Sequence, residues 1–282
     1  RWPQGYCCPR CNGKRAALTH NGRRLWECLG CRYQCSSIAG TIFEATQLPL
    51  TKWFLAMFLM TQSQNSIAAL ELMRMVGVSY KTAWLLKHKL LEVMFQREAP
   101  RRLSGRIELD DAYLGGEHEG KSGRGSENKV PFVAAVQTNA KGHPITVRFD
   151  RVKAFTSEEI KRWSANALDA KAHVISDGLG CFRAVTATAE SHEIIITGSG
   201  RKAVKKPEFH WVNTLLGNLK TAFSGTYHAF DFETYGYRYL AEFQYRFNRR
   251  FDLQAILPRL LQASVLTMPQ PLRILRLSEV SN

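Results

Sequence analysis

The placement of cysteines constrains the fold of this 282-residue chain more than any other feature. Six of its seven cysteines lie before residue 36, and four of them form the pairs Cys8-x-x-Cys11 and Cys28-x-x-Cys31. Two such pairs are typical of structural zinc, because each tight turn presents two thiolates to one tetrahedral ion. A region this small has little hydrophobic core, so zinc is expected to supply much of its folding free energy. We predict a zinc ribbon over residues 1–45.

The other cysteines leave the choice of ligands partly open. Cys7 and Cys35 each neighbour one of the pairs, whereas Cys181 lies far away and is interpreted as a small buried apolar residue. Scattered free thiols are the alternative to a metal site. No signal peptide is visible, so a reducing cytoplasm is expected. No apolar run approaches the roughly 18 residues that span a membrane, and because the chain starts with Arg, a short N-terminal piece is expected to precede it.

The charge balance favours a polyanionic partner. The chain carries 39 Lys+Arg against 24 Asp+Glu, a formal net charge of +15. Phosphate contacts by Lys and Arg dominate the affinity of proteins for nucleic acids, so this balance predicts nucleic-acid binding. A basic but otherwise ordinary enzyme is the alternative. With 45% hydrophobic residues, the chain is long enough for a sizeable core and more than one domain.

Residues 46–97 have the pattern of two helices joined by a short turn. Ser66 is a candidate cap for a helix that starts at Ile67 and ends near Gly77, and Ser79 is a candidate cap for a second helix that ends near Met94. This arrangement fits a helix-turn-helix, with an ordinary helical hairpin as the alternative. An apolar stripe runs along the second helix. The residues off the stripe that are predicted to face DNA are Tyr80, Lys81, Lys87 and His88.

Residues 105–255 alternate strand-like and helix-like segments. The predicted strands cover 106–110, 130–138, 145–150, 173–176 and 193–197. The predicted helices cover 157–168, 178–189 and 211–223. The order β-β-β-α-β-α-β-α is that of a ribonuclease-H-like domain, an α/β fold with a mixed five-stranded sheet. Residues 256–282 are assigned to a C-terminal tail.

Two aspartates are expected to meet at one edge of this sheet. In this strand order the first strand is central and the fourth lies parallel beside it, about 4.8 Å away. Asp110 and Asp177 end these two strands, so their carboxylates can share a divalent ion. Oxygen ligands and phosphoryl chemistry favour Mg²⁺ or Mn²⁺, and a pair of ions would stabilise an in-line displacement. Each aspartate alone also fits an ordinary turn.

Strand alternation assigns different positions to the neighbours of Asp110. Glu108 is predicted to lie on the same face of the strand as Asp110 and to support it. Asp111 is predicted to point to the opposite face. Further along the chain, Tyr235, Tyr239 and Phe243 recur at helical spacing and are predicted to be core residues rather than a nucleic-acid stacking surface.

Taken together, several motifs resemble those of ISXO-like bacterial insertion-sequence transposases. The motifs are Cys28-x-x-Cys31-Arg-Tyr-Gln, Ala39-Gly-Thr-Ile-Phe, Leu50-Thr-Lys-Trp-Phe, Glu108-x-Asp110-Asp111-x-Tyr113-x-Gly115-Gly116, Ser176-Asp177-Gly178, Asn213-Thr-Leu-Leu-Gly-Asn-Leu-Lys220, Gly225-Thr-Tyr-His228 and Glu242-Phe-x-x-Arg246-Phe-Asn248-Arg249-Arg250. They cover nearly the whole chain. The resemblance implies a D-D-E type enzyme that cuts DNA at the element's terminal inverted repeats and joins the ends to target DNA, as a homo-oligomer.

The resemblance also implies a third position for the catalytic site. That position often holds Glu, but some members resemble this chain in having Asn followed seven residues later by Lys, here Asn213 and Lys220. Seven residues are nearly two helical turns, so both side chains lie on one face. An amide oxygen binds Mg²⁺ without adding charge, so metal affinity is expected to be weaker than with three carboxylates. Asn218 and Glu208 are the alternatives for this position.

Basic residues elsewhere supply further expected DNA contacts. They are Arg201, Lys202, Lys205 and Lys206 in a loop, and Arg246, Arg249 and Arg250 in the closing helix. The prediction is therefore a transposase that uses Mg²⁺ or Mn²⁺ for catalysis and zinc for structure. Two alternatives stay open: a DNA-binding protein with a decayed catalytic domain, and a ribonuclease-H-like nuclease without strand transfer.

Overall fold

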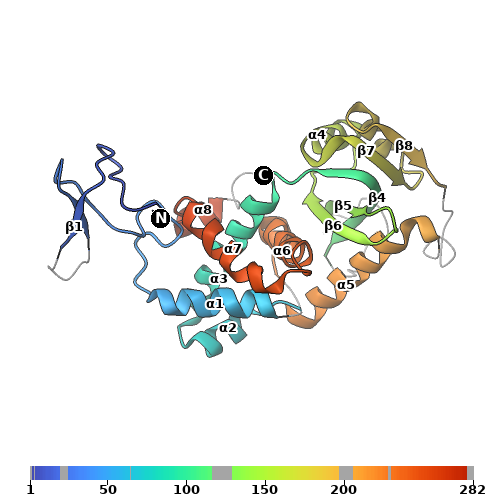
Figure 1. The fold of residues 1–282 in the computed structure, drawn as a ribbon. Coiled ribbons are helices and arrows are strands. Elements are labelled where there is room, and N and C mark those ends of the chain that lie inside the picture. Colours follow the sequence, from blue (N-terminus) through green and yellow to red (C-terminus); the bar gives the residue numbers. More distant parts are fainter. Residues whose placement is uncertain are drawn as a thin grey trace.

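The computed structural model describes residue 2 and residues 4–19, 25–63, 65–115, 129–196, 206–227 and 230–277. Three parts follow one another across the molecule in Figure 1: a small β module at the N-terminus, a helical body, and an α/β unit built on a five-stranded sheet. Among the described residues, every helix is too short or too polar to traverse a lipid bilayer.

The N-terminal module is a three-stranded antiparallel sheet. Its strands are β1 (Ala16–Leu18), β2 (Trp26–Cys28) and β3 (Gln34–Cys35). Trp2, Tyr6 and Trp26 contact one another through their rings, with centroids 4.8–6.2 Å apart. None of the three hydrophobic core clusters among the described residues draws on this module. Its folding therefore depends on these rings and on the cysteines.

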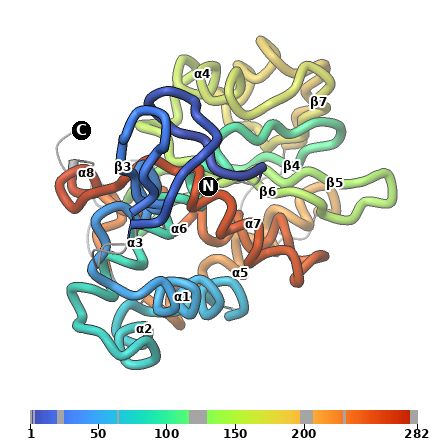
Figure 2. Tube along the Cα trace, turned by 60° about the vertical axis from the view of Figure 1, so that its left-hand side comes forward, coloured from blue at the N-terminus to red at the C-terminus, as the bar shows by residue number. Residues whose placement is uncertain are grey.

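The helical body is built from segments that precede the sheet unit in sequence and segments that follow it. Its helices are α1 (Leu50–Gln62), α2 (Ala69–Val76), α3 (Tyr80–Glu98), α6 (Phe232–Phe247), α7 (Leu253–Leu266) and α8 (Leu272–Leu277). One core contains residues from Ile42 to Met94 together with residues from Tyr239 to Ala263. Both views place the C-terminal helices beside α1 and α3 (Figures 1 and 2). The segment assigned to a tail thus contains most of α7 and all of α8.

The turn between α2 and α3 matches its sequence signals. Gly77 adopts the left-handed conformation (φ +67°) that ends α2, and the Ser79 side chain accepts from the backbone N–H of Thr82 to cap α3. The predicted cap at Ser66 is wrong, because α2 begins at Ala69 and the Ser66 hydroxyl donates to buried Glu242 instead. The Ser66 hydroxyl thus makes a tertiary hydrogen bond in place of the predicted local helix cap.

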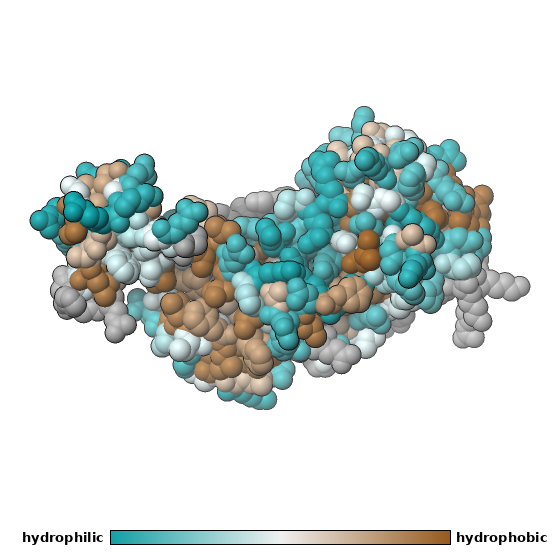
Figure 3. All heavy atoms as spheres, viewed as in Figure 1, coloured by the Kyte–Doolittle hydropathy of each residue, from teal (hydrophilic) through white to brown (hydrophobic). Residues whose placement is uncertain are grey.

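The outer face of α1 carries apolar side chains that the chain itself leaves uncovered. Phe54, Leu55 and Phe58 are 39%, 41% and 48% exposed. In the space-filling view, apolar residues gather over this lower part of the helical body (Figure 3).

The sheet has the predicted strand order, so the predicted α/β fold with a mixed five-stranded sheet is confirmed. Its order is β6-β5-β4-β7-β8, with β4 central, antiparallel to β5 and parallel to β7. The strands are β4 (Leu103–Leu114), β5 (Val130–Thr138), β6 (Pro144–Arg151), β7 (Leu168–Ser176) and β8 (Ser191–Ile194).

Helices cover both faces of this sheet. One face packs on α4 (Ser157–Ala167) and on the 3-10 helix η1 (Gly180–Ala187), where Cys181 is buried as predicted. The other face packs on α5 (His210–Thr226), which follows the short helix η3 (Pro207–Phe209), and on α6. Tyr239 is buried, and Tyr235 and Phe243 pack against the cores, as their spacing predicts. These layers hold α5 against the strands that carry the aspartates.

Candidate metal centres and DNA-contact residues

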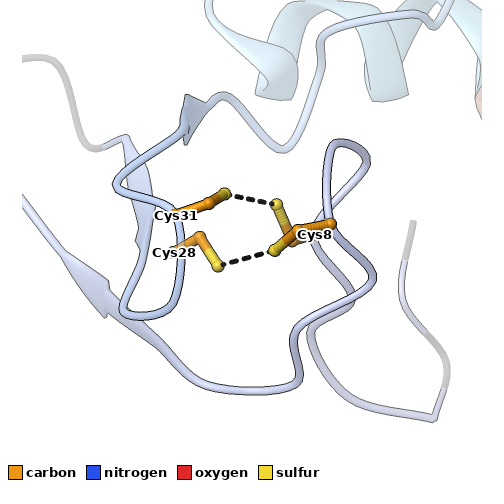
Figure 4. A group of neighbouring side chains, drawn as sticks. Cys8, Cys28 and Cys31 are labelled. Atoms are coloured by element: carbon orange, nitrogen blue, oxygen red, sulfur yellow. Dashed lines mark hydrogen bonds between the residues drawn. The ribbon is translucent and has the colours of Figure 1, made fainter.

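Four thiols meet between two turns of the N-terminal module. The Sγ atoms of Cys8 and Cys31 are 3.6 Å apart, and those of Cys11 and Cys28 are 3.5 Å apart (Figure 4). All four lie within 4.8 Å of one another, and neither Cys7 nor Cys35 belongs to the group. With a Zn–S distance of about 2.3 Å, the S···S edge of a tetrahedron is about 3.8 Å. The four thiols therefore fit one tetrahedral zinc ion.

The two cysteine turns have the same backbone geometry. Asn12 and Arg32, each directly after the second cysteine of a pair, have φ values of +58° and +57°. Their N–H groups donate to the carbonyls of Cys8 and Cys28, both at 2.9 Å. Burial raises the pKa of the Cys8 thiol, but backbone N–H groups that donate to its sulfur hold it down to about 6. The backbone N–H of Gly13 lowers the pKa of the Cys11 thiol, but hydrogen bonds with Cys31 and Cys28 raise it to about 12, so the turn favours the thiolate at Cys8 and not at Cys11.

A glycine permits the close approach of the two turns. A Cβ atom at Gly13 would lie 3.2 Å from the Cys28 sulfur and 3.3 Å from the Cys11 sulfur. A larger residue there would therefore push the two cysteine pairs apart.

Three carboxylates meet at one end of the sheet. Asp110 and Asp111 lie in the second half of β4, and Asp177 directly follows β7. Carboxylate oxygens of the three residues lie within 4.8 Å of one another, and all three side chains are half-buried. Pairing between β4 and β7 ends at Leu109 and Ser176, so the aspartates lie where the pairing stops. Asp110 and Asp177 come together as the strand order predicts.

The prediction that Asp111 points away from this group is wrong. Because β7 ends at Ser176, no strand of the described part of the chain pairs with β4 on that side at Asp110 and Asp111, and a carboxylate from either face can reach this edge. The backbone N–H of Asp111 also donates to the Asp110 carboxylate at 2.9 Å. Three ionised carboxylates this close repel one another, and a divalent cation relieves that repulsion. The donor set fits Mg²⁺ or Mn²⁺.

Glu108 caps helix α5, a role that strand alternation did not predict, and its predicted support of Asp110 stays a prediction. Its buried carboxylate accepts from the backbone N–H groups of Trp211 at 2.8 Å and Val212 at 2.9 Å, and from Arg106 at 2.9 Å. The residue at the N-cap position, Phe209, makes no side-chain cap. The strand that carries Asp110 therefore holds the first turn of α5, through partners more than 100 residues away that strand alternation does not reveal.

The first turn of α5 also carries Asn213. This side chain is half-buried, and its amide nitrogen donates to the carbonyl of Phe209 at 2.9 Å, which leaves the amide oxygen as its ligand atom. Lys220 and Asn218 are exposed further along the helix. Glu208 is not a member of the carboxylate group. The role of Asn213 stays a prediction.

Two of the residues predicted to face DNA from α3 are buried, and that prediction is wrong for both. Lys87 is fully buried and donates to the carbonyl of Ile67 at 2.5 Å and to the hydroxyl of Tyr227 at 3.0 Å. Burial lowers its pKa to about 8. His88 is 1% exposed and stacks on Trp84, and burial lowers its pKa to about 2, so it is neutral. Helix α6 packs against the side of α3 that carries these polar residues, outside the apolar stripe.

The arginines of the closing helix also have structural partners. Arg249 is buried, pairs with Glu98 at 2.5 Å and lies over the Tyr245 ring, so the predicted phosphate contact is wrong. Arg250 is half-buried, and its guanidinium donates to the Phe247 carbonyl at 2.8 Å. Arg246 is half-buried and donates to a backbone carbonyl in the helical body. None of these guanidinium groups stands as a free surface cation.

Lys81 is exposed on the first turn of α3, as a DNA contact requires. Five of the residues named from the sequence patterns lie outside the described residues: Gly116, Arg201, Lys202, Lys205 and His228.

Comparison with known proteins agrees with the sheet and its carboxylates. Residues 102–248 match the model of the ISXO2-like transposase domain, and this segment contains the three aspartates, Glu108 and Asn213. Over 224 residues the chain is 28% identical to a protein of Halobacterium salinarum described as an uncharacterized protein in transposable element ISH50, with 71% of each chain covered. Because the domain match spans more than half of its length, the chain belongs to the family of ISXO2-like transposases.

Proposed function

We propose that this protein cuts the ends of an insertion sequence and joins them to target DNA in a reaction that requires Mg²⁺ or Mn²⁺. The observation that carries the proposal is the meeting of three carboxylates at one end of a ribonuclease-H-like sheet, in a chain of a transposase family. A divalent cation bound there supplies a polarised oxygen nucleophile and shields the charge of the leaving oxygen.

Each residue of the site has its own role in this proposal. Asp110 and Asp177 hold the cation, with Asp111 beside them. Asn213 contributes a neutral amide oxygen in place of a third carboxylate. Glu108 acts as a positioning residue, because it fixes the helix turn that carries Asn213 to strand β4. Lys220 meets DNA phosphate from the exposed side of α5.

Two displacements at phosphorus account for the reaction. Water first attacks a phosphodiester at the element's end, and the P–O bond to the 3′ oxygen breaks to leave a 3′-hydroxyl. That hydroxyl then attacks a target phosphodiester, and one P–O bond forms as another breaks. No covalent bond to the protein is needed. Because two ends must be joined, at least two copies act together on DNA.

The N-terminal module and helix α3 have roles outside the catalytic site. We propose that Cys8, Cys11, Cys28 and Cys31 hold one structural zinc ion that supports the N-terminal module. The first turn of α3, with exposed Lys81, is proposed to meet the terminal repeats as the reading end of a helix-turn-helix.

A strand-transfer assay tests the catalytic proposal. The full-length protein is incubated with DNA carrying the element's ends, a target plasmid and Mg²⁺ or Mn²⁺, and joined products are measured. Asp110→Asn and Asp177→Asn should each abolish joining, whereas Asp252→Asn, a control at an exposed carboxylate paired with Arg259, should not. Joining by either site variant at the wild-type rate would refute the site.

The same assay separates the two alternative functions. Cut ends that are never joined would favour a nuclease without strand transfer. DNA binding without cutting in either metal would favour a DNA-binding protein with a decayed catalytic site.

A further inference from the structure

The two ends of α3 are open to solvent, with Gln96 and Arg97 exposed at its C-terminal end. Tyr80 and Lys81 are exposed, whereas the helix is buried at every position from Leu86 to Met94. A partner that approaches the N-terminal end of α3 therefore meets its first two turns, together with whatever lies beside them.

Helix α8 lies beside these turns and forms a groove with them. The groove has a volume of about 260 Å³ and lies between the start of α3 and α8. Its lining residues are Tyr80, Lys81, Trp84, Leu85, Leu272 and Arg276. Four of the six side chains are aromatic or aliphatic, and the other two are cations. None of the described residues that line the groove is acidic.

Buried contacts fix α8 in this position. Arg238 of α6 is 2% exposed, pairs with Glu92 of α3 at 2.9 Å and donates to the carbonyl of Leu275 at 3.2 Å. The Leu275 side chain is itself fully buried. One guanidinium thus joins α3, α6 and α8, so the groove belongs to the packed body of the protein.

Helix stability does not explain Lys81, whereas Arg276 lies in the last turn of α8, where the helix dipole favours a cation. No acidic residue lies in the first turn of α3, and Lys81 stands near the helix N-terminus, where the helix dipole disfavours a positive charge. A bound anion would reverse that penalty. Lys81 and Arg276 lie beside apolar side chains in the groove. This arrangement suits a phosphate that is attached to the C–H face of a deoxyribose.

We propose that this groove holds a sugar-phosphate segment of duplex DNA beside the bases that the start of α3 meets. In this arrangement Lys81 and Arg276 contact the phosphate, and Tyr80, Trp84 and Leu272 pack against the deoxyribose. Helix α8 thereby extends the DNA-contact surface beyond the helix-turn-helix. The inference rests on the proposed function, because it requires that the protein bind DNA.

The salt dependence of binding tests the groove. The probe is a 30-base-pair duplex that the wild-type, full-length protein selects from a random pool, and affinity is measured by fluorescence anisotropy from 50 to 200 mM salt. Each phosphate contact contributes about 0.9 to the slope of log affinity against log salt. Lys81→Gln and Arg276→Gln should therefore each lower the slope by about 0.9.

Arg273→Gln is the matched control. Arg273 lies on the same helix and is exposed, and the change removes the same charge, but it does not line the groove. A slope for Arg276→Gln equal to that of the wild type, or to that of Arg273→Gln, would overturn the groove as a phosphate site. A wild-type protein that selects no duplex would overturn the proposed DNA binding as well, so the two failures are distinguishable.

Discussion

Replacing Glu108 by alanine should destabilise the protein by about 3–5 kcal/mol. The carboxylate accepts two backbone N–H groups of α5 and one guanidinium, all within 2.9 Å, and it is buried. Hydrogen bonds to a charged group contribute about 1.5–3 kcal/mol each. The Arg106 side chain is 36% exposed, so water recovers most of its share. The expected loss of stability therefore comes mainly from the two backbone N–H groups, which are left without an acceptor.

Urea unfolding followed by circular dichroism measures this loss, and hydrogen exchange locates it. The amides of Trp211 and Val212 should exchange much faster in Glu108→Ala. Glu108→Gln keeps one acceptor oxygen and should lose about half as much stability. Glu158→Ala, at an exposed carboxylate in the first turn of α4, serves as control and should change stability by less than about 0.5 kcal/mol. If Glu108→Ala matched this control and the two amides stayed protected, Glu108 would not be the cap of α5.

Three further predictions concern the metal sites and pH. Metal analysis of the full-length protein should give about one zinc per chain, and Cys28→Ser should release it; a protein that folds without zinc would remove the ribbon. Asn213→Glu should lower the Mn²⁺ concentration needed for half-maximal strand transfer, because it adds a charged ligand; an unchanged requirement would place Asn213 outside the site. The folded pKa of His88 is about 2, below its ordinary 6.5, so the unfolded chain takes up a proton first and stability falls as pH drops from 6.5 towards 2. His88→Phe should therefore shift the acid-unfolding midpoint to lower pH, as measured by tryptophan fluorescence, and an unshifted midpoint would contradict this source of acid sensitivity.

Local patterns were sufficient to predict the strand order and the meeting of two aspartates. Alternation along each strand identifies the strands, and parallel neighbours bring their carboxyl ends to one edge, which places Asp110 near Asp177. The same alternation misplaced Asp111, because it assumes that a neighbouring strand continues, and β7 ends at Ser176. The meeting of Cys8, Cys11, Cys28 and Cys31 was predictable because tight turns determine the geometry of each pair within a few residues.

The wrong predictions on α3 and the unpredicted cap at Glu108 share one physical cause, which is burial by segments far along the chain. Lys87 lies off the apolar stripe of α3, yet its amine meets Tyr227, 140 residues later. Glu108 finds its N–H partners more than 100 residues away. When a helix is covered by other segments on two sides, its apolar stripe marks only one of them. Polar residues on the other side are then predicted to face solvent, and no spacing rule identifies the segment that buries them.

The helical body has a consequence for the order in which the chain folds. Its core needs residues from Ile42 to Met94 and residues from Tyr239 to Ala263, with the whole sheet between them in sequence. At a synthesis rate of about 5–20 residues per second, α3 waits roughly 7–30 s for α6 to be made. The sheet can close within that interval. A nascent chain thus completes the strands that carry its aspartates before the helix proposed to meet DNA is locked in place.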